Sequence, residues 1–532
     1  MTSSWNTPRG IDPKGRLFPW LILANTTIAT FIGGGSAVAG FVADSNIRGA
    51  LQMSSDDLQW ISISFIMMLG IILPLAVYLA ERFGYKRIFF AGIAFLTFGS
   101  LLNGLAFNFH TFLLSRMLAG AGAGALFPLS IAIINQTMPA SRMPLAMALN
   151  VAFGFGFGNA LGYYLSGYLC QWLSWPYAFI VFFILGLPVL LATWIIHPET
   201  PPQKDRVFDR FGYVLFTVFL TALLLTLNNA KAAWNTGGWT SPWILSTIFL
   251  CVLSLAILIP WEWKHSQPII PLQLFKTRSF TFGMLAVILI GASLYASQIY
   301  AVNFYDGALH WQKQTIGAQM AVQTLYLGFM STAVAFLSKR VSILLLTFSG
   351  LAILAISCFL QMNVTLYSDP NKYQMLLNAR MIATALALGP ATALALREIP
   401  QALGGAASML VTFARQVGGT IGVVAFYDVI YDRAIFHGQM FGAQVDMTNP
   451  RLQQTLRSVQ LHLERNCGLL PPEATVQATD IFRANVVTQS QVTATADAFY
   501  ALGWIIAVVS SLLLLEVLWG WMKRNSAVVS AE

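Results

Sequence analysis

Long runs without Asp, Glu, Lys or Arg limit most strongly how this chain can fold. The longest covers residues 143–198, which is 56 consecutive positions. Further charge-free runs cover 17–43, 58–80, 117–141, 211–230, 232–261, 279–305, 314–338 and 341–368. The apolar core of a bilayer is about 30 Å thick and needs roughly 20 apolar residues per helix. The runs therefore predict an all-α protein that crosses a membrane many times.

The composition excludes most other classes of protein. Of the 532 residues, 57% are hydrophobic and 10% are charged, against about 25% charged residues in soluble domains. A soluble enzyme, a disordered chain and a fibrous chain are excluded. The net charge of +9 comes from residues in short turns between apolar runs, so it does not indicate binding of nucleic acid. The four cysteines and six histidines lack the spacing of a disulfide framework or metal site, and we expect no cofactor and no enzymatic activity.

The apolar pattern predicts fourteen membrane spans. They lie at about 17–42, 57–80, 88–107, 110–134, 144–169, 175–197, 211–229, 242–262, 280–304, 314–337, 341–361, 373–396, 402–428 and 497–522. On this assignment the termini and the loops on their side hold 18 Lys and Arg residues, whereas the short loops on the other side hold four. This asymmetry places both termini in the cytoplasm.

One long segment, residues 431–496, lies between the last two predicted spans, on the outer side. It is expected to be a periplasmic loop, in which residues 452–463 have the pattern of a short amphipathic helix. A soluble cap, a surface for a partner protein and a flexible insert are all consistent with this sequence.

An internal repeat relates two parts of the chain. Residues 115–123, Ser-Arg-Met-Leu-Ala-Gly-Ala-Gly-Ala, resemble residues 379–387, Ala-Arg-Met-Ile-Ala-Thr-Ala-Leu-Ala. A proline follows each arginine, at Pro128 and Pro390. The repeat predicts a six-helix bundle in residues 1–200, two linker helices in 201–279 and a second six-helix bundle in 280–532, which is an arrangement of many secondary transporters.

The segment between spans two and three carries a recognisable motif. Residues 79–87 read Leu-Ala-Glu-Arg-Phe-Gly-Tyr-Lys-Arg, which resembles the cytoplasmic signature of the major facilitator superfamily, Gly-x-Leu-Ala-Asp-Arg-x-Gly-Arg-Lys. The motif combines a glycine turn with a carboxylate and basic residues that can pair with the neighbouring bundle. The candidate residues of a cytoplasmic gate are Glu81, Arg82, Gly84, Lys86 and Arg87.

Further segments resemble the fourteen-helix drug/proton antiporters of that superfamily. They are Leu-Gln-Trp at 58–60, Leu-Ser-Trp at 173–175, residues 271–280, residues 414–422 and Arg116-x-x-Ala119-Gly120. The resemblance implies two bundles that rock about a central site, with export of drugs or metabolites across the bacterial inner membrane. It also implies proton coupling, and it makes a periplasmic adaptor protein a candidate partner.

The sequence departs from the family at three places. Asn25 stands where the family has an aspartate in span one, and Asn cannot titrate. The fifth-span pattern has Tyr163 where the family has proline, and the second copy of the cytoplasmic signature is reduced to residues 338–340. Proton coupling is therefore in doubt, and Asp44 or Asp306, near the outer helix ends, are alternative carboxylates for it.

Three arginines within the predicted spans are candidates for substrate binding. Arg116, Arg380 and Arg415 keep a fixed charge, which favours an anionic metabolite or a polycarboxylate siderophore as an alternative substrate. The competing interpretation is that Arg116 and Arg380 extend to the outer surface or cap neighbouring helices through backbone carbonyls, and that Arg415 serves helix packing. Tyr163 and Gln298, with Tyr164, Tyr295, Tyr300 and Asn303, are candidates for lining a cavity. A membrane sensor or scaffold without transport is the alternative from another class.

Overall fold

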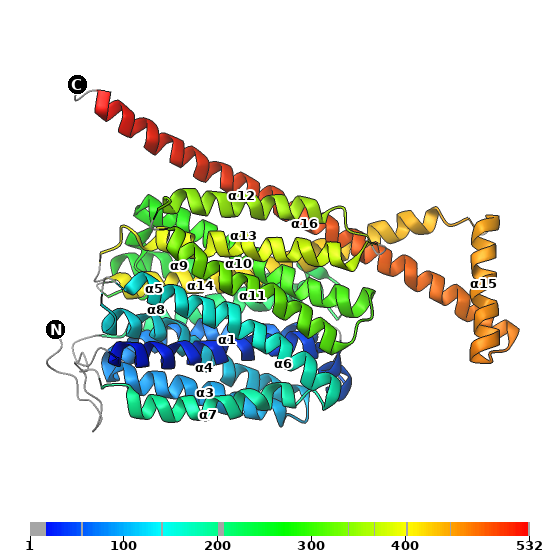
Figure 1. Ribbon diagram of the computed structural model, residues 1–532, viewed down its shortest axis with the longest axis horizontal. Helices are drawn as coiled ribbons and strands as arrows, with labels where there is room; N and C mark the ends of the chain where they lie inside the picture. The colour runs from blue at the N-terminus through cyan, green and yellow to red at the C-terminus, as the bar shows by residue number, and fades with distance from the viewer. Residues whose placement is uncertain are drawn as a thin grey trace.

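The chain forms one bundle of roughly parallel helices (Figure 1). The computed structural model describes residues 17–54, 57–139, 142–199, 207–232, 234–265, 267–338, 340–365, 368–400, 403–446 and 448–529. Within these residues, fourteen helices are long and apolar enough to cross a membrane. The prediction of an all-α membrane protein with fourteen spans is confirmed.

Six spans from the first part of the chain pack on one another. They are α1 (Phe18–Leu51), α2 (Asp57–Phe83), α3 (Tyr85–Gly104), α4 (Phe109–Thr137), a composite span of α5 (Met143–Val151), the π-helix η1 (Ala152–Phe157) and α6 (Gly158–Trp172), and α7 (Tyr177–Ile196). α4 packs against α1, α2 and α3, and α7 packs on α1 and α3. We call this group the N-terminal half.

A second group of six spans repeats this arrangement. It contains α10 (Arg278–Asn303) with the short π-helix η4 (Phe304–Ala308), α11 (Lys313–Leu337), α12 (Ile343–Gln361), α13 (Pro370–Leu396), α14 (Gly404–Ala443) and α16 (Pro471–Val529). α13 packs against α10, α11 and α12, as α4 does against the first three spans. The repeated residues 115–123 and 379–387 therefore lie on equivalent helices, α4 and α13.

The two halves meet along two seams. In the first seam, η1 and α6 pack on α11, and in the second α2 packs on α14. Two glycine pairs hold the first seam together closely, Gly156 with Gly328 and Gly167 with Gly317, and a Cβ on either member of the second pair would overlap the partner's backbone. Small residues allow this close approach of two membrane helices.

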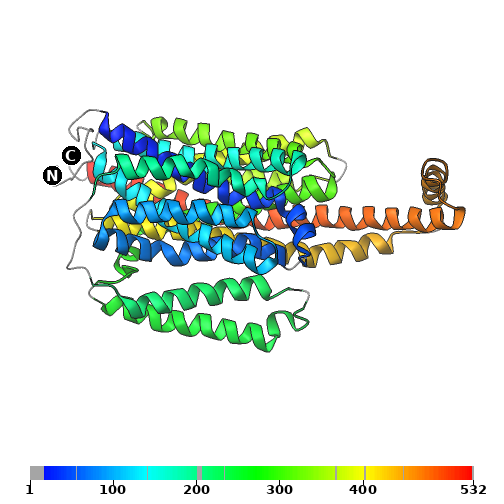
Figure 2. The same ribbon diagram turned by 90° about the horizontal axis from the view of Figure 1, so that it is seen from below.

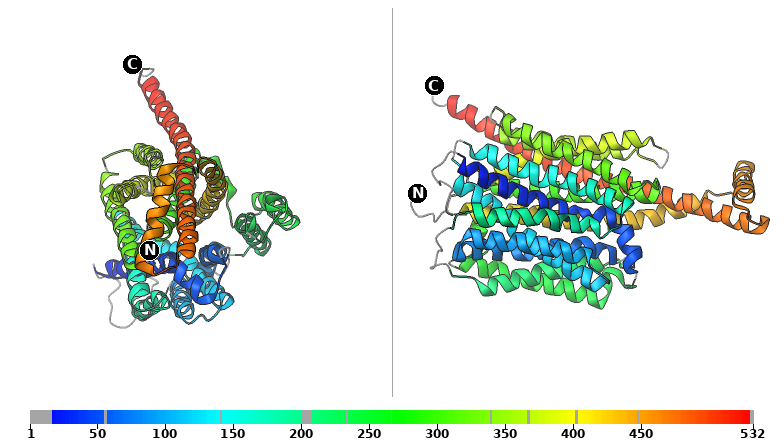
Figure 3. Two further views of the ribbon diagram at one scale, coloured as in Figure 1. Left: turned by 90° about the vertical axis from the view of Figure 1, so that its right-hand side faces the viewer. Right: turned by 60° about the horizontal axis from the view of Figure 1, so that its bottom comes forward.

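The two linker helices form a hairpin beside the bundle. α8 (Arg210–Asn229) and α9 (Pro242–Lys264) pack on each other, and α8 also contacts α2 and α14. The hairpin stands apart from the other helices in Figure 2 and in the left panel of Figure 3. It is attached where the second seam reaches the surface of the bundle.

Residues 431–496 are almost wholly helical, rather than an irregular loop. α14 and α16 each continue past the bundle, and α15 (Pro450–Cys467) crosses between their far ends (Figures 1 and 3). Leu463 of α15 packs with Ala474 and Ala478 of α16. We call this projection the arm.

Turn residues explain where the arm changes direction. Asn449 caps α15 by accepting a hydrogen bond from the backbone N–H of Arg451, and Pro450 occupies the first position of that helix. Gly468 ends it with φ +69°, a conformation that favours glycine. No such signal interrupts residues 428–443, so α14 continues beyond the apolar region.

The beginning of α1 and the end of α16 lie at one end of the bundle, opposite the arm (Figure 2). We call the two ends the terminus side and the arm side.

Candidate functional site: a cavity between the halves

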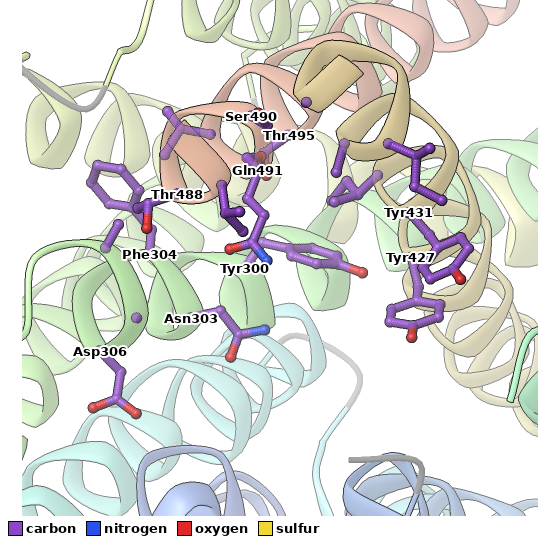
Figure 4. A pocket seen from close by; sticks show the side chains of 18 of the residues that line it. Tyr300, Asn303, Phe304, Asp306, Tyr427, Tyr431, Thr488, Ser490, Gln491 and Thr495 are labelled. Atoms are coloured by element: carbon purple, nitrogen blue, oxygen red, sulfur yellow. Dashed lines mark hydrogen bonds between the residues drawn. The ribbon is translucent and has the colours of Figure 1, made fainter. Parts of the chain in front are cut away.

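A large cavity opens between the two halves on the arm side. Its volume is about 940 Å³, and its walls come from α1, the end of α10 with η4, α14 and α16. Figure 4 shows Tyr427 and Tyr431 of α14 on one side of it, and Thr488 and Gln491 of α16 above Asn303. The part of α16 that lines the cavity belongs to the arm, so the arm extends the wall of the cavity away from the bundle.

Two smaller chambers continue from this cavity toward the middle of the bundle. The first, of about 180 Å³, shares Asp44, Tyr300 and Tyr427 with the large cavity and reaches Tyr295. The second, of about 20 Å³, is lined by Tyr295 together with Arg116, Phe155 and Gln416. A row of chambers thus runs from the arm side to the centre of the protein.

Aliphatic and aromatic side chains dominate the middle chamber. Phe41, Tyr295, Tyr300 and Tyr427 supply rings, and Asp44 is its charged lining residue. Tyr295 donates a hydrogen bond from Oη to Gln416 Oε1 at 2.5 Å. The sequence-based expectation that Tyr295, Tyr300 and Asn303 lie beside a cavity agrees with these positions.

Asp44 and Asp306 lie together at the mouth of the large cavity, around a lysine. Lys313 Nζ lies 2.8 Å from Asp306 Oδ2 and donates to Ser45 Oγ at 2.6 Å. Ser45 follows Asp44 in α1, whereas Asp306 and Lys313 belong to the C-terminal half. The lysine therefore links the two halves on the arm side. Sequence reasoning treated it only as a charge in a short loop.

Arg116 is buried and its guanidinium is bound by backbone. Nε donates to the carbonyl of Ile61 at 2.9 Å, Nη1 to that of Ser36 at 3.2 Å and Nη2 to that of Ala37 at 3.3 Å. It also lies 4.6 Å from the ring centroid of Phe65. These contacts match the carbonyl-binding interpretation, and they join α4 to α1 and α2 beside the smallest chamber.

Arg380, the equivalent residue of α13, is also buried, and it lines none of the three chambers. It stacks on Phe499 of α16 at 4.2 Å, and its nearest hydrogen-bond acceptors are Ser357 Oγ at 3.4 Å and Cys358 Sγ at 3.5 Å. The pseudo-symmetric arginines therefore both join helices within their own half.

Arg415 contacts the opposite half. Its guanidinium lies 4.0 Å from the ring centroid of Phe155, which belongs to the π-helix η1. Its Nε is buried and has no hydrogen-bond partner in the described part of the chain. π-Helical turns are frequent at functional sites, and this one places an aromatic ring between Arg415 and the smallest chamber, of which Phe155 is a wall.

Tyr163 and Gln298 form a hydrogen bond between the two halves. Tyr163 Oη of α6 donates to Gln298 Oε1 of α10 at 3.1 Å, and both side chains are buried. Gln298 Nε2 has no hydrogen-bond partner. Neither residue lines the three chambers, whereas Tyr164 is 45% exposed and stacks on Tyr168 at the outside of the bundle.

Asn25 lies on the terminus side, away from the chambers. Its side-chain amide donates to Thr193 Oγ1 at 2.8 Å and lies 3.0 Å from His197 Nε2. Burial, with a smaller effect from Lys86, lowers the pKa of His197 to about 3. The imidazole is therefore neutral and can accept the second hydrogen bond of Asn25. The amide joins α1 to α7, which explains how asparagine is accommodated here.

The signature residues form the predicted glycine turn between α2 and α3. Gly84 has φ +99°, which favours glycine. Arg82 donates to Tyr78 Oη at 2.8 Å, and Lys86 lies 5.6 Å from the ring centroid of Trp194 in α7. Arg87 is exposed and Glu81 is half-buried. The motif thus lies on the terminus side, between α2, α3 and α7.

A sequence profile identifies the family of this chain. The profile of the Major Facilitator Superfamily matches residues 26–423, about three quarters of the sequence. The chain belongs to the Major Facilitator Superfamily. Its two pseudo-symmetric halves with a cavity between them have the architecture expected of such a transporter.

Several of the curated proteins that resemble the chain are named as multidrug transporters, and others as uncharacterised transporters of the superfamily. The probable multidrug resistance protein EmrY of Escherichia coli is 24% identical over 87% of this chain and 92% of its own length. The multidrug transporter mfsC of Aspergillus fumigatus is 30% identical over 59% of this chain and 57% of its own length. The chain is therefore a Major Facilitator Superfamily transporter with multidrug-efflux relatives.

Solved structures of superfamily transporters share the fold. The match with the POT family transporter PepTSo covers 94% of this chain and 99% of the PepTSo chain, with a TM-score of 0.58. The match with the proton:xylose symporter XylE covers 93% of this chain and 95% of the XylE chain, with a TM-score of 0.58. Each is 14% identical to this chain, so the likeness concerns the fold alone.

Proposed function

We propose that this transporter exports amphipathic aromatic molecules, drugs or metabolites, across the bacterial inner membrane by alternating access. The observation that carries the proposal is the row of chambers between the halves, whose middle chamber has four aromatic rings and one carboxylate, Asp44. Rings bind flat apolar groups and attract cations through their faces. The names of EmrY and mfsC as multidrug proteins support the same substrate class.

The contacts of the arginines do not support the anionic alternative. Arg116 donates to three carbonyls, and Arg380 lies outside the three chambers. Arg415 is separated from the smallest chamber by the ring of Phe155. An anion entering from the arm side would meet Asp44 before it met any of these residues.

The orientation follows from the loop charges together with the position of the arm. The terminus side carries the excess of Lys and Arg, so we assign it to the cytoplasm and the arm to the periplasm. In that orientation the large cavity opens to the outside. We assign to the arm the role of contact surface for a periplasmic adaptor protein, because it extends the wall of the cavity beyond the bundle.

Asp44 and Asp306 are the carboxylates that we assign to proton coupling. Protonation of Asp306 would weaken its ion pair with Lys313, and Lys313 also holds Ser45 of the other half. A proton entering from the periplasm would in this way reduce the attraction between the halves at the mouth of the cavity. Asn25 cannot take this role, because an amide does not titrate.

A flux assay in proteoliposomes tests the proposal. Ethidium, an aromatic cation, is the probe, and a pH gradient is imposed across the membrane. We expect gradient-driven transport that is strongly reduced in Asp44→Asn and Asp306→Asn and unchanged in Asp480→Asn, whose carboxylate is exposed on the arm. Absence of ethidium flux with the wild-type protein, or equal activity in all three variants, would contradict it.

A further inference from the structure

The linker hairpin contains two buried carboxylates at its terminus-side end. Asp209 is 4% exposed and caps α8, accepting from the backbone N–H of Gly212 at 2.8 Å. Its two oxygens also accept from Trp261 Nε1 at 3.0 and 2.9 Å. Glu262, one residue further along α9, is 2% exposed. Neither side chain lines the large cavity or the two smaller chambers.

The two carboxyl groups face each other across Gly212. Glu262 Oε1 lies 2.7 Å from the position that a Cβ on Gly212 would occupy, and Asp209 Oδ2 is in contact with the same point. The two oxygens are therefore at most about 5 Å apart. Among the described residues, Glu262 Oε1 is buried without a hydrogen-bond partner, whereas Asp209 accepts from two donors, the backbone N–H of Gly212 and Trp261 Nε1. Two adjacent buried charges of the same sign are unfavourable.

The other oxygen of Glu262 holds the chain that leads from the hairpin into the C-terminal half. Glu262 Oε2 accepts a hydrogen bond from the backbone N–H of Ile270 at 3.0 Å. Ile269 and Ile270 line a small cavity together with Leu73 and Pro74 of α2 and Met409 of α14. The two isoleucines thus lie in the second seam, in the terminus-side half of both helices.

We propose that Glu262 and Asp209 form a proton-binding site that keeps the second seam closed on the cytoplasmic side. With the proton on Glu262 Oε1, the pair carries one negative charge, and Glu262 can remain buried and bound to Ile270. When the O–H bond breaks and the proton leaves for the cytoplasmic water, both carboxylates are charged. Glu262 then turns toward water, and the segment carrying Ile269 and Ile270 is released from between α2 and α14.

Few other charges face this pair among the described residues. His265 Nδ1 lies 3.9 Å from Asp209 Oδ2, and its side chain is 25% exposed, so it lies between the pair and the solvent. Arg210 and Lys264 are exposed on the flanks of the hairpin, and Lys276 lies 4.9 Å from the ring centroid of Trp263. Toward the second seam, α8 places Tyr213, whose Oη donates to the backbone carbonyl of Ile71 in α2 at 3.1 Å, and the uncharged Phe216, which contacts Phe413 of α14.

Infrared difference spectroscopy of the purified protein in lipid nanodiscs tests for the bound proton. We expect a carboxylic-acid C=O band that disappears on raising the pH and is missing in Glu262→Gln. The exposed carboxylate of Glu398 provides the matched control, Glu398→Gln, in which the band should persist. A pH-dependent band that is unchanged in Glu262→Gln would overturn the assignment.

A distance measurement tests the effect on the seam. Spin labels at Phe83→Cys, at the end of α2, and Gly405→Cys, at the start of α14, report on its cytoplasmic end, and a Cβ on Gly405 meets no atom within 4 Å. Cys251 and Cys467, which are not buried, are first replaced by serine. We expect the distance between the two labels to lengthen as the pH rises when Glu262 is present. It should stay short when the labelled protein also carries Glu262→Gln.

Glutamine keeps an oxygen for Ile270, so this variant retains the contact while losing the titration. Equal lengthening with and without Glu262→Gln, or none in either, would overturn the proposal. Neither measurement uses a transport substrate, so failure of the proposed drug export would not affect the result.

Discussion

Arg116 Nε donates to the backbone carbonyl of Ile61 at 2.9 Å, across the contact between α4 and α2. The other two nitrogens donate to α1, so one guanidinium binds two helices through their backbones. Helix carbonyls normally accept bonds within their own helix, and a charged donor adds a strong second bond. Arg116, one of the three arginines that the sequence suggests for substrate binding, is therefore a structural link of the N-terminal half.

Replacing Arg116 by Met should destabilise the protein by about 2–4 kcal/mol, because it removes three charge-assisted hydrogen bonds from a buried site. The measurement is the apparent melting temperature in detergent, which should fall by several degrees. Arg82→Met, which changes an exposed arginine, is the control and should have little effect. A loss of ethidium transport without any loss of stability would instead favour direct binding of substrate by Arg116.

The first seam depends on glycine. Gly156 lies against the backbone of Gly328, so Gly156→Ala would force η1 and α11 apart. Overpacking of a close contact costs about 1–3 kcal/mol, and we expect reduced thermal stability together with reduced transport. Gly389→Ala is the matched control, since a Cβ there meets no atom within 4 Å. Equal melting temperatures of the two variants would contradict the close contact between Gly156 and Gly328.

The pH dependence of stability should report on His197. Its pKa in the folded protein, about 3, lies below the ordinary value of 6.5. Between these values the unfolded chain binds a proton that the folded chain does not, so stability falls as the pH drops below about 6.5, by up to about 1.4 kcal/mol per pH unit.

His197→Gln keeps an acceptor for Asn25 and removes the titration. Its stability curve between pH 7.5 and 5.5 should therefore be flatter than that of the wild-type protein. His462→Gln, on the exposed face of the arm, is the control and should leave the curve unchanged. A curve for His197→Gln as steep as that of the wild type would contradict a buried neutral imidazole.

The spans were predictable because the bilayer imposes their length and composition, and the Gly84 turn was predictable because its motif specifies it. In the arm, the amphipathic helix predicted at residues 452–463 is present as α15 (Pro450–Cys467). The extensions of α14 and α16 were not predicted because they are polar, although Pro450, Gly468 and Pro471 mark helix ends in the sequence. The partners of Arg116 could not be read from the sequence, since the carbonyls it binds are 55–80 residues away. The contact of Lys313 could not be predicted for the same reason, because its partner Ser45 is 268 residues away in the sequence.

The Lys313 contacts lead to a prediction for access to the cavity. Lys313→Met removes both the ion pair to Asp306 and the hydrogen bond to Ser45. The ion pair is partly exposed, since 13% of the Lys313 side chain and 33% of the Asp306 side chain are accessible to solvent. Losing it should therefore weaken the attraction between the halves by about 1 kcal/mol. That change raises the fraction of molecules whose cavity is open on the arm side roughly fivefold. The rate at which a thiol reagent modifies Gly307→Cys, at the mouth of the cavity, measures that population. Lys372→Met, which changes an exposed lysine at the start of α13, is the control and should not alter the rate. If Lys313→Met also leaves the rate unchanged, Lys313 does not hold the two halves together, and the coupling role assigned to Asp306 loses its physical basis.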